Sequence, residues 1–107
     1  MKRIMLCCSA GMSTSLLVRK MKEVAAERGE EVQIDAFGAS EFDEKFRDYQ
    51  VVLLGPQVRY MQADLSKRAA EFHIPVETIN MMDYGMQRGD NVLDFAYGLI
   101  AQEGSRV

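Results

Sequence analysis

Two adjacent thiols, Cys7 and Cys8, stand where an apolar run ends and a loop of small and hydroxyl-bearing residues begins. The run before the loop predicts a strand, and the apolar spacing that follows Ser15 predicts a helix. The first turn of a helix presents unpaired N–H groups and the positive end of the helix dipole, which favour a bound anion. The same field is expected to lower the pKa of a thiol at this point and make it a nucleophile. The pattern therefore predicts that a phosphoryl group is held on Cys8.

The charge pattern agrees with an anion site, because the first 22 residues contain no Asp or Glu but five basic residues. The first acid after Cys8 is Glu23. A helix that needed only its own stability would often place an acid in its first turn, so we interpret this turn as reserved for an external anion. The alternative is structural. Ser13, Thr14 and Ser15 are then ordinary N-cap candidates, and both cysteines are small buried hydrophobes at a strand end.

The composition is that of a soluble globular protein. The 107 residues are 48% hydrophobic and 27% charged, enough for one domain with one core. No apolar run approaches the roughly 18 to 20 residues that span a bilayer, and no signal peptide is evident, so we expect a cytoplasmic protein that is not inserted in the membrane. The net charge of −3 argues against nucleic acid as a partner. Two adjacent cysteines and one histidine predict neither a disulfide framework nor a zinc site.

Short β-rich runs alternate with helical ones, which predicts an α/β fold with a single-domain open four-stranded parallel sheet and helices on both faces. The predicted strands cover residues 2–7, 32–37, 50–54 and 76–79. The predicted helices cover residues 13–28, 40–47, 58–72 and 90–103, the last with Asp90 as its cap. Right-handed crossovers give the strand order 2-1-3-4. We assign residues 1–103 to the domain and 104–107 to a frayed tail.

In an open α/β sheet the functional crevice lies at the carboxyl ends of the strands, beside the point where the strand order reverses. Cys8 ends the first strand there. Its neighbours are expected from the turn after the third strand, which contains Gln57, and from the loop after the fourth, which contains Asp83 and Tyr84. The hydroxyl of Tyr84 would then be in reach of a phosphate oxygen, and the alternative is a packing tyrosine. His73 falls at the opposite end of the sheet and is interpreted as structural or exposed.

The loop lacks the residue with which Cys-x5-Arg phosphatases hold phosphate. Those enzymes clamp the phosphate with an Arg six residues after the cysteine, whereas the same count reaches Thr14 from Cys8 and Ser13 from Cys7. No nearby Asp is an obvious general acid. A phosphocysteine here should be hydrolysed slowly, which suits a carrier that passes the group onward. A phosphatase or arsenate-reducing enzyme is the weaker hypothesis, and a non-catalytic module regulated by phosphorylation of Cys8 is a third.

Residues 8–17, Cys-Ser-Ala-Gly-Met-Ser-Thr-Ser-Leu-Leu, resemble the phosphorylation loop of enzyme IIB of the bacterial phosphotransferase system, in the lactose, cellobiose and chitobiose family. The resemblance extends to residues 51–57, Tyr60-Met61, and Tyr84-Gly85 followed by Gly89. It implies a four-stranded parallel sheet flanked by helices and a protein-cysteine phosphotransferase that carries phosphoryl groups in sugar uptake.

The same resemblance implies two partner proteins. A histidine of enzyme IIA donates the phosphoryl group, and a β-linked disaccharide of the cellobiose, chitobiose or lactose type accepts it while entering through the membrane component, enzyme IIC. The protein would then act in the cytoplasm and transiently at the inner face of the cell membrane.

Carried over residue by residue, the resemblance makes Cys8 the phosphorylated nucleophile. The phosphate-binding cradle becomes Ser9, Ala10, Gly11, Met12, Ser13, Thr14 and Ser15. Cys7 stands where an apolar or aromatic residue is expected, and we interpret it as a strand residue whose side chain points to the other face. No metal or cofactor is expected, because the loop amides and the helix dipole already offset the charge of a phosphoryl group.

Overall fold

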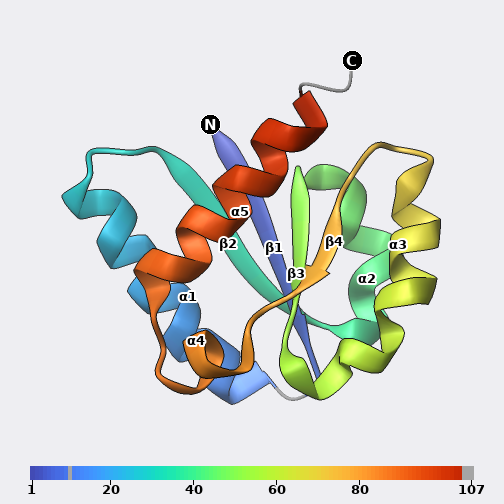
Figure 1. Cartoon of the computed structure of the whole chain (residues 1–107), viewed down its shortest axis with the longest axis horizontal. Helices are drawn as coiled ribbons and strands as arrows, with labels where there is room; N and C mark the ends of the chain where they lie inside the picture. The colour runs from blue at the N-terminus through green and yellow to red at the C-terminus, as the bar shows by residue number, and fades with distance from the viewer. Residues whose placement is uncertain (10, 105–107) are drawn as a thin grey trace.

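Four parallel strands form one sheet in the order β2-β1-β3-β4, which confirms the predicted topology (Figure 1). The strands are β1 (Lys2–Cys8), β2 (Val32–Gly38), β3 (Val51–Leu54) and β4 (Val76–Thr78). Every residue of β3 is buried, as expected of a parallel strand covered on both faces. The structure is a computed structural model and describes residues 1–9 and 11–104.

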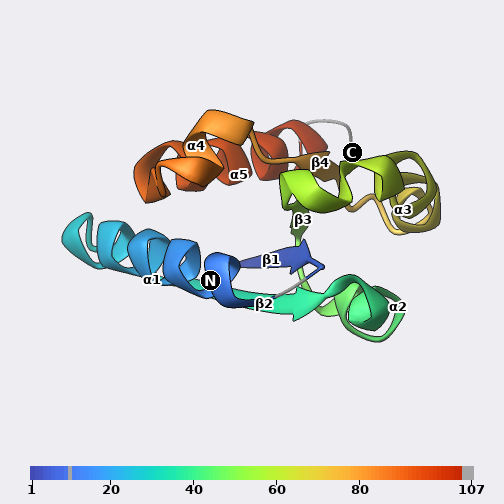
Figure 2. The same cartoon turned by 90° about the horizontal axis from the view of Figure 1, so that it is seen from below.

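Helices cover both faces of the sheet, as predicted (Figure 2). One face carries α1 (Gly11–Glu27) and α5 (Gly89–Gly104), with the short α4 (Met81–Gly85) beside the start of α1. The other face carries η1 (Ala39–Glu41), α2 (Phe42–Lys45), η2 (Phe46–Asp48), η3 (Pro56–Met61) and α3 (Gln62–Ala70), where η marks a 3-10 helix. Among the described residues, no helix is both long enough and apolar enough to cross a membrane.

The alternation of side chains along β1 divides the interior into two cores. Ile4 and Leu6 pack in the core under α1 and α5, whereas Met5 and Cys7 pack in the core under α2 and α3. All four side chains are completely buried. Since both faces of the central strand are covered by apolar side chains, polar chemistry on this strand is confined to its ends.

The segment after β2 forms three short helical turns rather than the single helix predicted over residues 40–47. Ser40, the expected cap, lies inside η1, and the Glu41 carboxylate instead accepts a hydrogen bond of 3.2 Å from the last backbone N–H of β2. Phe42 and Phe46 stack in this segment with ring centroids 4.5 Å apart. Burial of these rings holds the segment in place, because so short a helix has little stability of its own.

Two helices begin earlier in the chain than predicted, and α4 was not predicted. α1 begins at Gly11, and α5 begins at Gly89, so that Asp90 lies inside its first turn rather than before it. α4 occupies a stretch predicted as a loop. Its N-cap is Asn80, whose side-chain oxygen accepts hydrogen bonds from the second and third backbone N–H groups that follow, at 2.9 and 3.2 Å.

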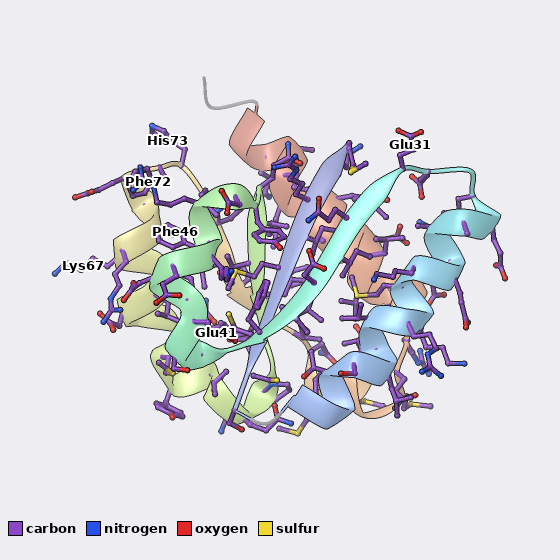
Figure 3. The ribbon with its side chains drawn as sticks, turned by 180° about the vertical axis from the view of Figure 1, so that it is seen from behind. Glu31, Glu41, Phe46, Lys67, Phe72 and His73 are labelled. Atoms are coloured by element: carbon purple, nitrogen blue, oxygen red, sulfur yellow. The ribbon has the colours of Figure 1, made fainter. Side chains whose placement is uncertain are left out.

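The helix predicted over residues 58–72 is divided. Its first part is η3, which begins at Pro56 and contains Val58 with a non-helical φ of −116°, and only residues from Gln62 onward are α-helical. At the opposite end of the sheet from Cys8 lies His73, which is exposed, one of the two alternatives predicted for it, and has a left-handed φ of 57° (Figure 3). The predicted frayed tail lies outside the described residues, apart from Gly104 at the end of α5.

Candidate functional site

The carboxyl ends of the parallel strands lie at one edge of the sheet (Figure 1). Cys8 is the last residue of β1, one of the two inner strands, and so lies at this edge. Cys8 is paired with Gly38 of β2. On its other side Gly55, the residue after β3, donates its N–H to the Cys7 carbonyl at 2.8 Å. The turn that contains Gln57 therefore lies next to Cys8, as the sequence predicted.

Gly55 keeps open a space that is shared by Cys8 and Gln57. A Cβ atom added at Gly55 would lie 3.5 Å from the Cys8 Cβ and 2.6 Å from the Gln57 Oε1. The second distance is too short for any real contact, so the Gln57 side chain folds over the glycine. The Gln57 amide thus borders the same space as the cysteine.

The two cysteines have different environments. Cys7 is completely buried in the core with Leu54 and Val58, on the face predicted for it. Burial, with smaller contributions from Cys8 and Glu41, raises the pKa of the Cys7 thiol to about 12. Cys7 is therefore a protonated, unreactive thiol at neutral pH. Cys8 is 1% exposed, so a reaction at its sulfur requires a partner or a movement that uncovers it.

The helix that begins beside Cys8 has the features of an anion site. α1 begins at Gly11, three residues after Cys8, continues for 17 residues and has no acidic residue in its first turn. Its unpaired N–H groups and its dipole therefore face the Cys8 end of the sheet without a competing carboxylate. Among the described residues, no group of three or more His, Cys, Asp or Glu side chains is arranged to hold a metal ion.

Three of the predicted cradle residues have side chains that the structure describes. Ser9 and Ser15 are exposed, and Thr14 is 1% exposed. Ala10 lies outside the described residues, and the side chains of residues 11–13 are likewise not described. The described part of the cradle therefore contains one buried hydroxyl, that of Thr14.

Tyr84 contacts the cradle, whereas Asp83 is bonded to α5. The Tyr84 hydroxyl lies 3.2 Å from the Thr14 Oγ1, within hydrogen-bond distance. The Asp83 carboxylate instead accepts a hydrogen bond of 3.0 Å from the Asn91 side chain of α5. Of the two residues predicted from this loop, the structure brings Tyr84 to the start of α1 and ties Asp83 to α5.

An exposed apolar surface on and after α4 was not singled out from the sequence. Met81, Met82 and Met86 are 64%, 67% and 59% exposed. A cavity of about 250 Å³ is lined by Thr78, Ile79, Asn80, Asp83, Val92 and Phe95. The sequence feature that could have indicated this surface is the Met81-Met82 pair directly after Asn80, which caps α4. Exposed methionines suit adaptable contacts with other proteins.

Comparison with known proteins gives a consistent result. The family model for the lactose/cellobiose-specific IIB subunit of the PTS system matches residues 3–95. The oligo-beta-mannoside-specific EIIB component of Bacillus subtilis (strain 168) is 46% identical over 103 residues, which cover 96% of this chain and 100% of that protein. The galactose-specific EIIB component of Lactococcus lactis subsp. cremoris (strain MG1363) is 44% identical, with 92% and 96% covered.

A solved structure supports the same relationship. The cellobiose-specific phosphotransferase IIB component from Borrelia burgdorferi superposes with a TM-score of 0.80 at 34% identity and covers 95% of this chain and 94% of its own. The lactose-specific IIB component domain from Streptococcus pneumoniae has the same TM-score at 18% identity, with 91% and 95% covered, and shows a shared fold.

Proposed function

Because the chain belongs to the lactose/cellobiose family of PTS IIB subunits, we propose that Cys8 is the residue on which it carries the phosphoryl group. As a IIB component the chain is a phosphotransferase and a phosphoryl carrier in sugar uptake. One observation carries the proposal for Cys8. This residue ends β1 three residues before a 17-residue helix whose first turn has no acid, while the Cys7 side chain packs in the core under α2 and α3.

In the proposed reaction the Cys8 sulfur attacks the phosphorus of a phosphohistidine on enzyme IIA. The S–P bond forms as the N–P bond breaks, and the histidine nitrogen keeps the electron pair and takes the proton that the thiol has lost. In the second step a sugar hydroxyl oxygen attacks the same phosphorus, the S–P bond breaks, and the hydroxyl proton ends on sulfur. The N–H groups at the start of α1 stabilise the phosphoryl oxygens in both steps.

The cradle is assigned to Ser9, Ala10, Gly11, Met12, Ser13, Thr14 and Ser15. Gln57 lies next to Cys8 across the space at Gly55, and Tyr84 contacts the cradle through Thr14. Asp83 accepts a hydrogen bond from Asn91 of α5, and no contact with the described part of the cradle supports a direct role for it in the transfer. Backbone amides, a helix dipole and hydroxyl groups supply the polar contacts that a phosphoryl group needs.

A IIB component implies enzyme IIA and enzyme IIC as partners. Both must reach Cys8, so both are proposed to bind the surface around the carboxyl edge of the sheet. Met81, Met82 and Met86 on one side of this edge are exposed, as is Tyr60 of η3, which follows the neighbouring strand. An apolar, adaptable surface of this kind suits a protein that must bind two different partners in turn.

The transported sugar is proposed to be a β-linked disaccharide of the cellobiose, chitobiose or lactose type. Relatives named for oligo-beta-mannoside, galactose and cellobiose are 46%, 44% and 43% identical to this chain, and such small differences in identity do not separate the sugars. Specificity is expected to reside mainly in enzyme IIC. The protein is proposed to act in the cytoplasm, at the inner face of the membrane during the second step.

The test is phosphorylation followed by intact mass. The purified protein is incubated with phosphoenolpyruvate, enzyme I, the histidine phosphocarrier and several family IIA proteins, beside the variants Cys8→Ser and Cys7→Ser. One phosphoryl group should appear on the wild type and on Cys7→Ser and be absent from Cys8→Ser. Phosphorylation that persists in Cys8→Ser would overturn the assignment of the nucleophile. No added mass with any IIA, together with measurable phosphatase or arsenate-reductase activity, would overturn the carrier function.

A further inference from the structure

In the described part of the chain, a hydrogen bond joins Thr14 of the proposed cradle to Tyr84 of α4, across 70 residues of sequence. The Thr14 Oγ1 and the Tyr84 hydroxyl oxygen are 3.2 Å apart. We propose that Tyr84 is a positioning residue for phosphoryl transfer, which orients the Thr14 hydroxyl so that it donates to the phosphoryl group on Cys8. The inference rests on the proposed function, because it requires that Cys8 be phosphorylated.

Thr14 occupies a chemically significant place in the loop. It follows Cys8 by six residues, the spacing at which Cys-x5-Arg phosphatases place the Arg that clamps phosphate. Side chains on a helix lean toward its N-terminus, which for α1 is the end beside Cys8. Thr14 is also 1% exposed, so its hydroxyl must find partners inside the protein. A phosphoryl group on Cys8 and the hydroxyl of Tyr84 are two such partners.

The chemistry of two hydroxyls decides the direction of the hydrogen bonds. Each hydroxyl has one proton to donate and can accept at its oxygen, and either member of this pair can be the donor before phosphorylation. A phosphoryl dianion only accepts, and a hydrogen bond to it is charge-assisted and stronger than one between neutral groups. The Thr14 proton is therefore directed to the phosphoryl oxygen, and the Tyr84 proton to the Thr14 oxygen. Each bond polarises the next, and neither hydroxyl loses its proton.

Tyr84 is held firmly enough to impose this direction. Its backbone N–H donates to the Asn80 carbonyl at 2.9 Å, and the Asn80 side chain caps the same short helix. The hydrogen bond from Asn91 to Asp83 fixes α4 against α5. The Tyr84 side chain packs against the core under α1 and α5. A hydroxyl on an anchored ring can orient a partner at little cost in conformational entropy.

The two hydroxyls of Thr14 and Tyr84 hold a phosphoryl group differently from an arginine clamp. A guanidinium would add a full positive charge and two parallel hydrogen bonds, which hold phosphate strongly. A chain of two neutral hydroxyls stabilises the group during transfer and adds no charge that would retain it afterwards. That property suits a site that must release the phosphoryl group to a second acceptor.

The test separates positioning from partner binding. Phosphorylation by phosphorylated IIA is followed by rapid quench at increasing IIA concentration, which yields a maximal rate constant and a half-saturating concentration. Tyr84→Phe should lower the maximal rate constant about tenfold, the cost of one hydrogen bond in the transition state, and leave the half-saturating concentration unchanged. Tyr97→Phe removes the same atom from a tyrosine of α5 at the opposite end of the sheet from Cys8, where the Lys2 Nζ lies 4.9 Å from the ring centroid, and should leave both values unchanged.

Variants at Thr14 provide a second route that does not depend on Tyr84. Thr14→Val should be slowed at least as much as Tyr84→Phe, whereas Thr14→Ser, which keeps the hydroxyl, should retain most of the rate. If Tyr84 acts through Thr14, adding Tyr84→Phe to Thr14→Val should cause no further loss. Cooperative thermal unfolding of each variant shows that the fold is intact.

Three results would overturn the inference and leave the proposed function in place. These are a maximal rate constant for Tyr84→Phe within twofold of the wild type, an effect on the half-saturating concentration alone, and an equal loss from Tyr84→Phe with and without the Thr14 hydroxyl. A wild-type protein that accepts no phosphoryl group would overturn both proposals.

Discussion

Two strand-to-helix turns lie side by side at the carboxyl edge of the sheet, and they differ in what they offer a ligand. After β1 the chain enters a 17-residue α-helix within three residues of Cys8. After β3 it passes through Gly55 into the six residues of η3, which begin with Pro56 and are interrupted at Val58, before α3 begins. In the sequence both turns read as an apolar strand, a small residue and a helical pattern.

The physical difference lies in the first turn of each helix. Pro56 has no N–H, so η3 lacks a backbone donor at its first position. Val58 is non-helical and interrupts η3, so the peptide dipoles of η3 do not add to those of α3. The connection after β1 leads into α1, an uninterrupted helix with no acidic residue in its first turn. Only the first is suited to an anion. The connection after β3 supports this anion site instead, because the Gly55 N–H donates to the Cys7 carbonyl and the missing side chain of Gly55 leaves room beside Cys8.

The largest effect on stability is expected where α5 packs closely against α1. A Cβ at Gly89 would lie 2.7 Å from the backbone of Lys20 and Met21, so Gly89→Ala must push α5 away from α1. We expect a loss of about 1–3 kcal/mol in the free energy of unfolding, as for other overpacked cores. Gly98→Ala, at a helical glycine with open space around it, should gain about 0.5–1 kcal/mol. Urea denaturation measures both, and equal stability of the two variants would contradict the close packing.

An acid placed in each turn tests the comparison directly. Met12→Glu puts a carboxylate in the first turn of α1, where it competes with the phosphoryl group for the same N–H groups and repels it. The rate of Cys8 phosphorylation should fall about tenfold. Gln57→Glu adds the same charge to the second turn and should lower the rate less. Rapid-quench phosphorylation at low and high salt measures this, and an equal loss in both variants would show that only net charge matters.

The pH dependence of stability should reveal the buried thiol of Cys7, which packs with Leu54 and Val58 around the second strand-to-helix turn. The folded-state pKa of Cys7 is raised to about 12 from 9.0, so its contribution to stability is fully present below pH 9 and is lost as the pH rises toward 12. Between pH 8 and pH 10 the wild type should lose about 1.4 kcal/mol more than a Cys7→Val variant. Denaturant titrations at these pH values measure the difference. Parallel curves would mean that the Cys7 thiol titrates normally.

The smallest effect is expected at Gly55. Gly55→Ala must displace the Gln57 amide, whose end is flexible, and adds a methyl group in ordinary contact with the Cys8 Cβ. We expect a stability change below about 1 kcal/mol and a phosphorylation rate about threefold lower, because the space beside the thiol shrinks. Gln57→Ala alone separates loss of the amide from loss of the space. No change in rate for either variant would mean that the second turn does not shape the site.

The sequence predicted the sheet and its order because β1 and β3 are continuous apolar runs and the crossover rule leaves few arrangements. It also placed Cys7 on the correct face through the alternation of strand side chains. The distinction between the two turns was missed, since helical spacing from Val58 onward does not reveal a 3-10 helix. The hydrogen bond between Thr14 and Tyr84 was also beyond local patterns, because it depends on how α4 packs on α1. α4 itself was recognisable only from the capping Asn80.

The burial of Cys8 has a consequence for the protein between transfers. With 1% of its surface exposed, the sulfur rarely meets dissolved oxidants, which attack thiols according to their accessibility as well as their ionisation. Its neighbour Cys7 is packed on the opposite face of the strand, where it cannot close a disulfide without distorting β1. For the proposed role of Cys8, this burial means that the thiol of an idle carrier stays in the reduced form between transfers.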